Sequence, residues 1–153
     1  MGARRKAREL ALQMLFQFDL SGNEPETIIR TFEDLQKARP NIREFAVRVF
    51  EGTVRSLKEI DGMISNQADN WRLSRMAVVD RNIIRMSIYE FQNETDTPKL
   101  VIIDEAIEIA KKFGTQKSSQ FINGILDGIL KRYNLHDSEP TESLARNDDE
   151  DDI

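Results

Sequence analysis

The chain has 153 residues, enough for one domain with a substantial core, and it has no cysteine, which excludes disulfides, thiolate catalysis and cysteine-based zinc sites. No apolar run exceeds four residues, as in Leu100 to Ile103, so we expect a soluble cytoplasmic protein without a membrane-spanning helix. The formal net charge is −5, but residues 137–153 hold eight acids and one base, which leaves 21 bases and 19 acids elsewhere and allows a basic surface.

Apolar residues recur at helical spacing along most of the chain, and no stretch shows the sustained alternation of a half-buried strand. We therefore predict an all-α domain. The first helix is predicted from Ala3 to Leu20, with Gly22 just past its end. The second begins near Pro25 and stops before Pro40, since proline suits the first turn of a helix and disfavours helical backbone in the residue before it.

A long third helix is predicted, capped by Asn41 and ending near Asp69. The helical period then breaks over residues 70–77. We expect this segment to join two subdomains, residues 1–70 and 71–135.

Three helices are predicted in the second half of the chain. The first passes through Val79 and Phe91, the next opens at Pro98 and ends at Gly114, and Thr115 caps the last. The predicted inner faces comprise Ala7, Leu10, Ala11, Met14, Phe18, Ile28, Ile29, Phe32, Leu35, Phe45, Val49, Thr53, Ser56, Ile60, Ile64, Ile83, Met86, Leu100, Ile103, Ile107, Ala110, Ile122, Ile125, Leu126, Ile129 and Tyr133.

Gly124 and Gly128 lie four residues apart on the last predicted helix. They would let another helix approach closely, either within the domain, which is the favoured interpretation, or in a homodimer. Residues 136–153 have few large apolar side chains and many acids, so they cannot bury enough surface to offset the entropy of ordering. We expect this acidic segment to be disordered.

Arg4, Arg5, Lys6 and Arg8 stand at the start of the first predicted helix. The positive end of the helix dipole disfavours cations there by roughly a few tenths of a kcal/mol each. Phosphate groups of a nucleic acid would compensate this arrangement and give salt-dependent binding. The alternative is that the four bases only solubilise the end of the chain.

Residues 111–121 mix lysines, small polar side chains and two phenylalanines at a corner between two predicted helices. Exposed helix amides, hydroxyls and lysines suit phosphate, and an exposed ring can stack on an unpaired base. In the alternative, the lysines complement the helix dipole and both rings lie in the core.

Arg81 and Arg85 are predicted to form structural ion pairs, for which Asp80 and Glu90 are in reach. The chain has no zinc-protease, serine-hydrolase or P-loop motif, and the lone His136 cannot chelate a metal by itself. We therefore expect a binding protein, with no enzymatic activity, cofactor or metal.

Three stretches taken together resemble the NusB family of bacterial transcription antitermination factors. They are RRKARELALQMLFQFDLSG at the start, AVVDRNIIRMSIYEF in the middle and VIIDEAIEIAKKFGTQKSSQFINGILDGIL near the end. The similarity extends from about Arg4 to Tyr133. It implies a fold of about seven helices arranged as two three-helix bundles.

The resemblance also implies partners. Family members pair with the small-subunit ribosomal protein NusE and bind the boxA element of nascent ribosomal RNA, which helps RNA polymerase pass terminators. Matched position by position, and with Lys112 added from the corner, the implied RNA-binding residues are Arg4, Arg5, Lys6, Arg8, Lys112, Gln116, Lys117 and Phe121, and the implied partner-interface residues are Phe16 and Asp80.

Lys117 stands where other members can have an acid, so it should strengthen RNA attraction and make it less dependent on the partner. The acidic segment is no family requirement, and it could compete with RNA for the basic face. Two other functions stay open. One is a helical protein-interaction module without an RNA role, and the other is an RNA-recruiting domain related to RNA cytosine methyltransferases, which would need a further S-adenosylmethionine-binding domain.

Overall fold

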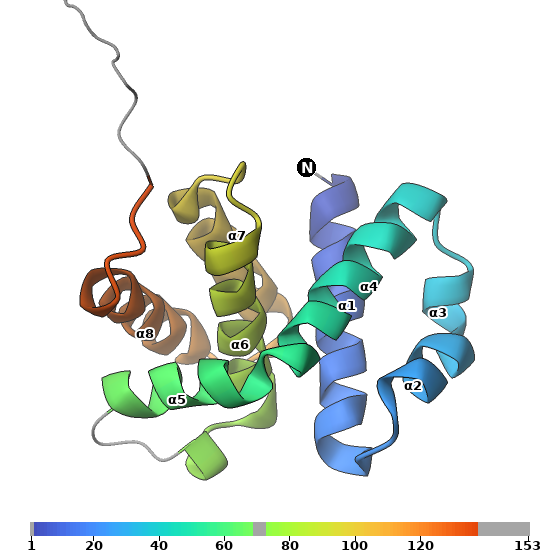
Figure 1. Cartoon of the computed structure of the whole chain (residues 1–153), viewed down its shortest axis with the longest axis horizontal. Helices are drawn as coiled ribbons and strands as arrows, with labels where there is room; N and C mark the ends of the chain where they lie inside the picture. The colour runs from blue at the N-terminus through green and yellow to red at the C-terminus, as the bar shows by residue number, and fades with distance from the viewer. Residues whose placement is uncertain (1, 69–72, 138–153) are drawn as a thin grey trace, which may run out of the picture.

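The computed structural model describes residues 2–68 and 73–137, and all regular structure within them is helical (Figure 1). The all-α prediction is therefore confirmed. The described helices are α1 (Gly2–Ser21), α2 (Pro25–Thr31), α3 (Glu33–Gln36), α4 (Pro40–Arg55), α5 (Leu57–Gln67), the 3-10 helix η1 (Leu73–Arg75), α6 (Val78–Asn93), α7 (Lys99–Phe113) and α8 (Ser118–Arg132).

α1 follows its prediction closely. Gly22 adopts a φ of +70° directly after the helix, and its N–H donates to the carbonyl of Phe18 at 3.0 Å. Glycine suits this left-handed position because it has no Cβ. The predicted inner face is confirmed, with Phe18 partly buried against Phe50 and the other members fully buried: Ala7, Leu10, Ala11 and Met14.

Two predicted helices are each broken in two. Extended backbone at Phe32 (ψ 101°) separates α2 from α3, and Ser56 (φ −99°, ψ 13°) separates α4 from α5. The inner faces continue across both breaks, because a change in axis direction leaves the spacing of apolar residues intact. Asn41 was wrongly predicted as a cap, since Pro40 already occupies the first turn and Arg39 precedes it.

The bend at Ser56 directs α5 against α6 and α8. Gly128 of α8 lies directly against the side chain of Gln67, so this glycine serves internal packing, whereas a Cβ at Gly124 would meet no atom within 4 Å. The division of residues 1–135 into two subdomains stays a prediction. The predicted disorder after Leu135 concerns residues that, apart from His136 and Asp137, lie outside the described part of the chain.

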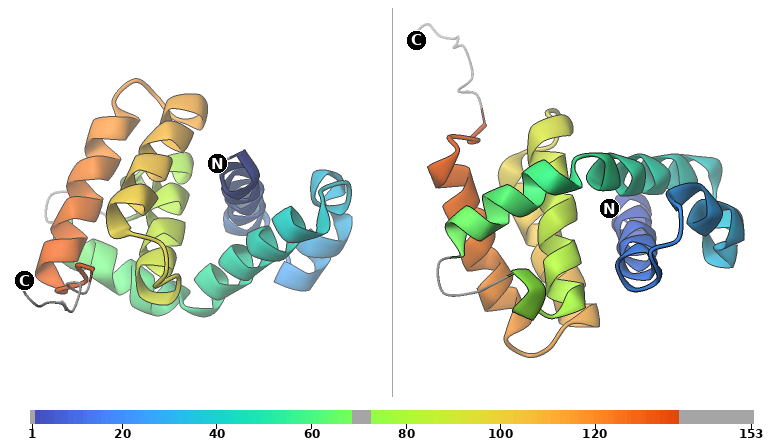
Figure 2. Two further views of the ribbon diagram at one scale, coloured as in Figure 1. Left: turned by 90° about the horizontal axis from the view of Figure 1, so that it is seen from above. Right: turned by 60° about the horizontal axis from the view of Figure 1, so that its bottom comes forward.

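α6 is the central helix and packs against α1, α4, α5, α7 and α8. Every residue from Asn82 to Phe91 is buried. α1 lies between the α6–α8 helices and the short helices α2 and α3 (Figure 2). No helix among the described residues is long and apolar enough to cross a membrane.

Two predictions about the later helices are wrong. Leu100 is 67 % exposed, because α7 turns Ile102, Ile103 and Ala106 toward the core instead. Thr115 does not cap the last helix, which begins at Ser118.

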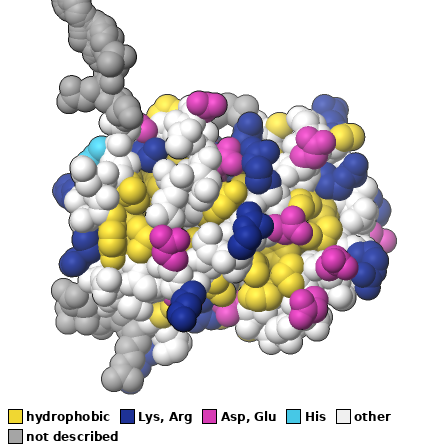
Figure 3. Space-filling view, viewed as in Figure 1, with side chains coloured by type: hydrophobic (Ala, Val, Ile, Leu, Met, Phe, Trp, Pro, Cys, Tyr) yellow, Lys and Arg dark blue, Asp and Glu magenta, His cyan; other side chains and the backbone are white. Residues whose placement is uncertain are grey.

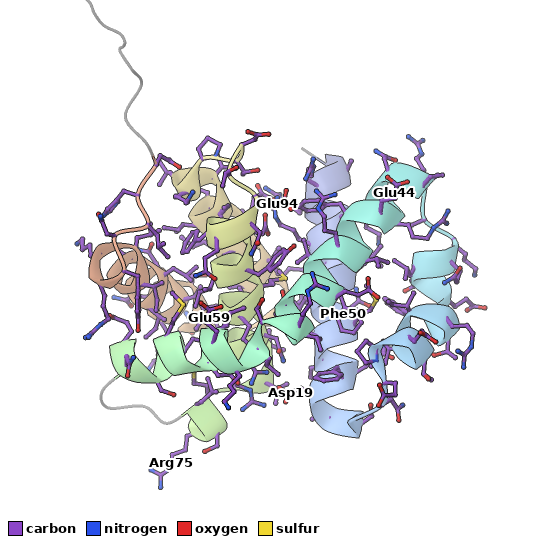
Figure 4. The ribbon with its side chains drawn as sticks, in the orientation of Figure 1. Asp19, Glu44, Phe50, Glu59, Arg75 and Glu94 are labelled. Carbon is purple, nitrogen blue, oxygen red and sulfur yellow. The ribbon has the colours of Figure 1, made fainter. Side chains whose placement is uncertain are left out.

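Arg81 and Arg85 form structural ion pairs, as predicted, but with other partners. Asp19 accepts hydrogen bonds from Arg81 Nη2 (2.7 Å), Arg85 Nη1 (3.1 Å) and Asn82 Nδ2 (3.1 Å), and Asp61 accepts two from Arg85. Burial raises the pKa of Asp19, but these hydrogen bonds and charges outweigh it and hold the pKa below its usual value. Figure 4 shows Asp19 near the end of α1 opposite to its N-terminus.

Candidate nucleic-acid interface

The four basic residues at the start of α1 have different environments. Arg8 is buried and donates two hydrogen bonds of 2.8 Å to the carboxylate of Glu90 on α6. Arg5 donates two, of 2.9 and 2.8 Å, to Glu105 on α7. The unfavourable placement of cations at a helix N-terminus is thus compensated for these two residues by acids of the same chain.

Both pairs are strong charge-assisted interactions. Burial lowers the pKa of the Arg8 guanidinium, but the hydrogen bonds and charge of Glu90 outweigh it and raise that pKa. The hydrogen bond from Arg5 lowers the pKa of Glu105, and the charges of Arg5 and Arg8 lower it further. Burial raises the pKa of the Glu90 carboxyl above its usual value, although the hydrogen bonds and charge of Arg8 oppose this rise. The two pairs hold α1 against α6 and α7.

Arg4 and Lys6 are exposed. The Arg4 guanidinium lies 3.9 Å from the centroid of the Phe45 ring on α4, which is close cation–π geometry. Lys6 makes no ion pair or side-chain hydrogen bond with any described residue. These two cations are the members of the predicted basic cluster that can reach a ligand without breaking an ion pair.

The second predicted group lies where α7 ends and α8 begins. The Nζ of Lys112 is 3.0 Å from the carboxylate of Glu9, which ties this corner to α1 while the Lys112 side chain stays 61 % exposed. A Cβ on Gly114 would lie 2.5 Å from Ser118 Oγ, so the tight corner requires glycine. Gln116 and Lys117 are both exposed on it.

A pocket of about 570 Å³ lies between this corner and the N-terminal end of α6, and Asp80, Lys117 and Phe121 are among its lining residues. Asp80 is only 8 % exposed, and its Oδ1 has no hydrogen-bond partner among the described residues. An unsatisfied buried carboxylate oxygen is costly, so a donor from outside the chain would stabilise it. Phe121 is partly buried against the core, as the structural alternative for this ring expected.

Phe16 lies in a neighbouring groove of about 320 Å³ with Gln13, Gln17, Val79 and Phe113. Its side chain is 38 % exposed, which is unusual for a large apolar residue in this chain. Val79 directly precedes Asp80, and Phe113 opens the corner, so the groove and the pocket adjoin. The two predicted interface residues therefore lie beside the predicted RNA-binding corner.

The basic end of α1 and this corner are parts of one surface. From Lys6 to Phe16 is ten residues, or about 15 Å along the helix axis at 1.5 Å per residue. Both are tied to α7, through the pairs Arg5–Glu105 and Glu9–Lys112. The face shown in Figure 3 carries a mixture of basic and acidic side chains.

Sequence reasoning missed the residues that position this surface. Glu90, Glu105 and Glu9 hold the basic side chains, and Phe45 supports Arg4, yet the ion pairs join residues 82 to 103 positions apart in the sequence. No local spacing carries such a signal.

The family comparison gives one clear result. A model of the NusB family matches residues 5–131. The transcription antitermination protein NusB of Koribacter versatilis is 44 % identical over 134 residues, covering 85 % of this chain and 90 % of the relative. That of Desulforamulus reducens is 46 % identical over 127 residues, covering 83 % and 89 %.

Solved structures agree. T. maritima NusB matches with a TM-score of 0.79 and 39 % identity, over 94 % of this chain and 97 % of that one. A chain from a crystal structure of the antitermination factors NusB and NusE in complex with dsRNA matches with a TM-score of 0.78 and 27 % identity, over 87 % and 99 %.

Proposed function

The chain belongs to the NusB family of transcription antitermination proteins, and we propose that it binds boxA-like RNA together with the ribosomal protein NusE. It acts by binding, not by catalysis. A role beside RNA polymerase also implies a cytoplasmic location. The observation that carries the proposal is the placement of exposed cations on α1 and the α7–α8 corner. They lie beside an exposed Phe16 and beside Asp80, whose Oδ1 has no hydrogen-bond partner among the described residues.

The basic residues divide into two roles in this proposal. Lys6, Lys112 and Lys117 contact phosphates, since their side chains reach solvent, and Arg4 can offer the outer face of its guanidinium to a base while the inner face rests on Phe45. Arg5 and Arg8 act as positioning residues, because releasing either would leave a carboxylate without its partner.

The corner supplies further RNA contacts in this proposal. Gln116 offers an exposed side-chain amide that can donate to or accept from a base edge, and the partly buried ring of Phe121 lines the pocket. Phosphate contacts would give most of the affinity and base contacts the sequence preference.

Phe16 and Asp80 form the proposed contact with NusE. The Phe16 ring is an exposed apolar anchor of the kind that dominates protein interfaces. Asp80 Oδ1 accepts no hydrogen bond from any described residue and could accept one from the partner. Because the RNA and partner surfaces adjoin, each bound molecule would raise the effective concentration of the other.

A fluorescence-anisotropy titration tests the proposal. Labelled single-stranded boxA-like RNA and a scrambled RNA of equal length are titrated with the protein at about 50 mM and 200 mM salt, with and without NusE. We expect a preference for the boxA-like RNA, weakening with salt and tightening with NusE. Equal binding of both RNAs in every condition would leave a helical interaction module without an RNA role.

A further inference from the structure

We propose that the acidic residues 138–153 bind the exposed cations at the N-terminal end of α1 and compete there with RNA. This inference rests on the proposed RNA-binding function and adds an intramolecular competitor to it. Four observations support it: an anchor at Asp137, the position of that anchor, the charge of the segment, and cations on α1 that have no ion pair with any described residue.

The anchor is the contact between Asp137 and the first residue of α7. The backbone N–H of Lys99 donates to both carboxylate oxygens of Asp137, at 3.1 and 3.3 Å, and the Lys99 Nζ lies 3.5 Å from the same carboxylate. A carboxylate is favoured at this end of a helix by the free N–H groups and the dipole. Asp137, which directly precedes residues 138–153, is therefore held at the N-terminus of α7.

This anchor lies level with the start of α1. The pairs Arg5–Glu105 and Glu9–Lys112 show that α1 and α7 run in the same direction side by side. Lys99 precedes Glu105 by six residues, or about 9 Å toward the N-terminal end. In Figure 1 the N-terminus of α1 and the last described residues both lie toward the top of the view.

Residues 138–153 have the charge and the length to reach the cations of α1. Residues 138–153 hold seven acids and one base, and residues 148–152 are all acidic. Sixteen fully extended residues span at most about 50 Å. Along α7, Lys99 lies only about 9 Å from Glu105, the partner of Arg5. Of the basic residues at the start of α1, Arg5 and Arg8 are neutralised by glutamates. Arg4 and Lys6 are therefore the cations there that can attract the acidic residues.

Competition of this kind has a defined consequence. An RNA that is held by phosphate contacts alone must displace the acidic segment, so its net affinity is low. An RNA that also makes base contacts, in a complex with NusE, can displace it. The segment would therefore lower the affinity for unrelated RNA more than the affinity for the specific complex.

The first test uses a neutralised chain, D148N/D149N/E150Q/D151N/D152N, and a control chain in which residues 138–153 are shuffled without change of composition. We expect the neutralised chain to bind scrambled RNA roughly five-fold more tightly at about 50 mM salt, with the gain lost at about 200 mM. The shuffled chain should match the native one. In an Arg4→Gln/Lys6→Gln background, neutralisation should give no gain. An equal gain in that background, or no gain in the native one, would overturn the proposal.

The second test detects the contact without RNA. Because the chain has no cysteine, Glu150→Cys provides a single site for a paramagnetic spin label. Amide signals of residues 3–8 should be broadened and those of residues 19–22 should not, and about 500 mM salt should remove the broadening. Absence of broadening overturns the inference whatever the RNA result. Broadening in a protein that binds no RNA would instead refute the proposed function and keep the contact.

Discussion

The guanidinium of Arg8 on α1 and the carboxylate of Glu90 on α6 form a two-point ion pair, with both hydrogen bonds at 2.8 Å and side chains only 5 % and 1 % exposed. The ring of Phe45 lies 5.5 Å from the same guanidinium and 3.9 Å from that of Arg4. One buried pair thus fixes the start of α1 and, through Phe45, the exposed Arg4 beside it.

Removing one partner of this pair should lower the free energy of unfolding much more than removing one partner of an exposed pair. Arg8→Ala leaves the Glu90 carboxylate buried without a counter-ion, so the free energy of unfolding should fall by about 3–5 kcal/mol. Urea denaturation measures this, with Lys37→Ala as the control, since its pair with Glu33 is 71 % and 80 % exposed and should contribute about 1 kcal/mol or less. Equal effects of the two changes would contradict this account of α1.

Asp19 should make stability depend on pH on the acid side. Its pKa in the folded protein lies below the ordinary value of 3.8, so its contribution is complete above that pH and is lost as the pH falls toward the folded value. Asp19→Asn should be less stable than the native chain at about pH 6, and the gap should narrow by about pH 3. A gap that is constant over this range would show that the Asp19 charge does not matter.

Lys6 should act on RNA without acting on the fold. Lys6→Gln should weaken RNA binding, lower the slope of log affinity against log salt by about 1, and leave the melting temperature unchanged. Lys37→Gln, at an exposed lysine directly after α3, serves as the matched control and should change neither the salt slope of RNA binding nor the melting temperature. An unchanged salt slope for Lys6→Gln would remove this residue from the interface.

Lys117 should contribute to RNA attraction from the α7–α8 corner. Charge reversal by Lys117→Glu should weaken RNA binding about ten-fold at low salt and make binding depend more strongly on NusE, because a repulsive charge then lines the pocket with Asp80. Lys58→Glu, an exposed site on α5, controls for the change in net charge. Equal losses for both variants would mean that only net charge matters.

Phe16 and Asp80 should affect the protein partner more than RNA alone. Phe16→Ala and Asp80→Asn should each weaken NusE binding about ten-fold or more, since one removes an apolar anchor and the other a charged acceptor. Calorimetric titration with NusE measures this. Leu20→Ala, at a more exposed apolar position of the same helix (63 %), should bind normally. Normal NusE binding by both test variants would place the partner elsewhere.

Much of the fold could be predicted from the sequence because the apolar spacing and the end residues of a helix lie within its own segment of the chain. The limits of α1 follow from its apolar spacing and Gly22, and the end of α7 from Gly114. The breaks at Phe32 and Ser56 could not be predicted, since neither proline nor glycine marks them and the inner faces continue across. They depend on tertiary packing, as the contact of α5 with α6 and α8 shows.

The candidate site could be predicted as a set of residues but not as a set of roles. The basic cluster looked uniform in the sequence, whereas the structure buries Arg8, pairs Arg5 and exposes Lys6. What separates them is which face of α1 each occupies and which acid of a distant helix it meets. Nothing in the sequence distinguishes Glu90 and Glu105 from other acids. They form ion pairs with Arg8 and Arg5 only when α6 and α7 pack against α1.

The proposed function requires RNA to bind along the start of α1 and the α7–α8 corner. The most direct test is to map amide chemical shifts of the native chain on titration with boxA-like RNA. We expect the amide signals of residues 3–8 and 112–121 to shift and those of residues 25–36 in α2 and α3 to stay in place. Shifts confined to α2 and α3, or no shift at any RNA concentration that saturates binding in the presence of NusE, would contradict it.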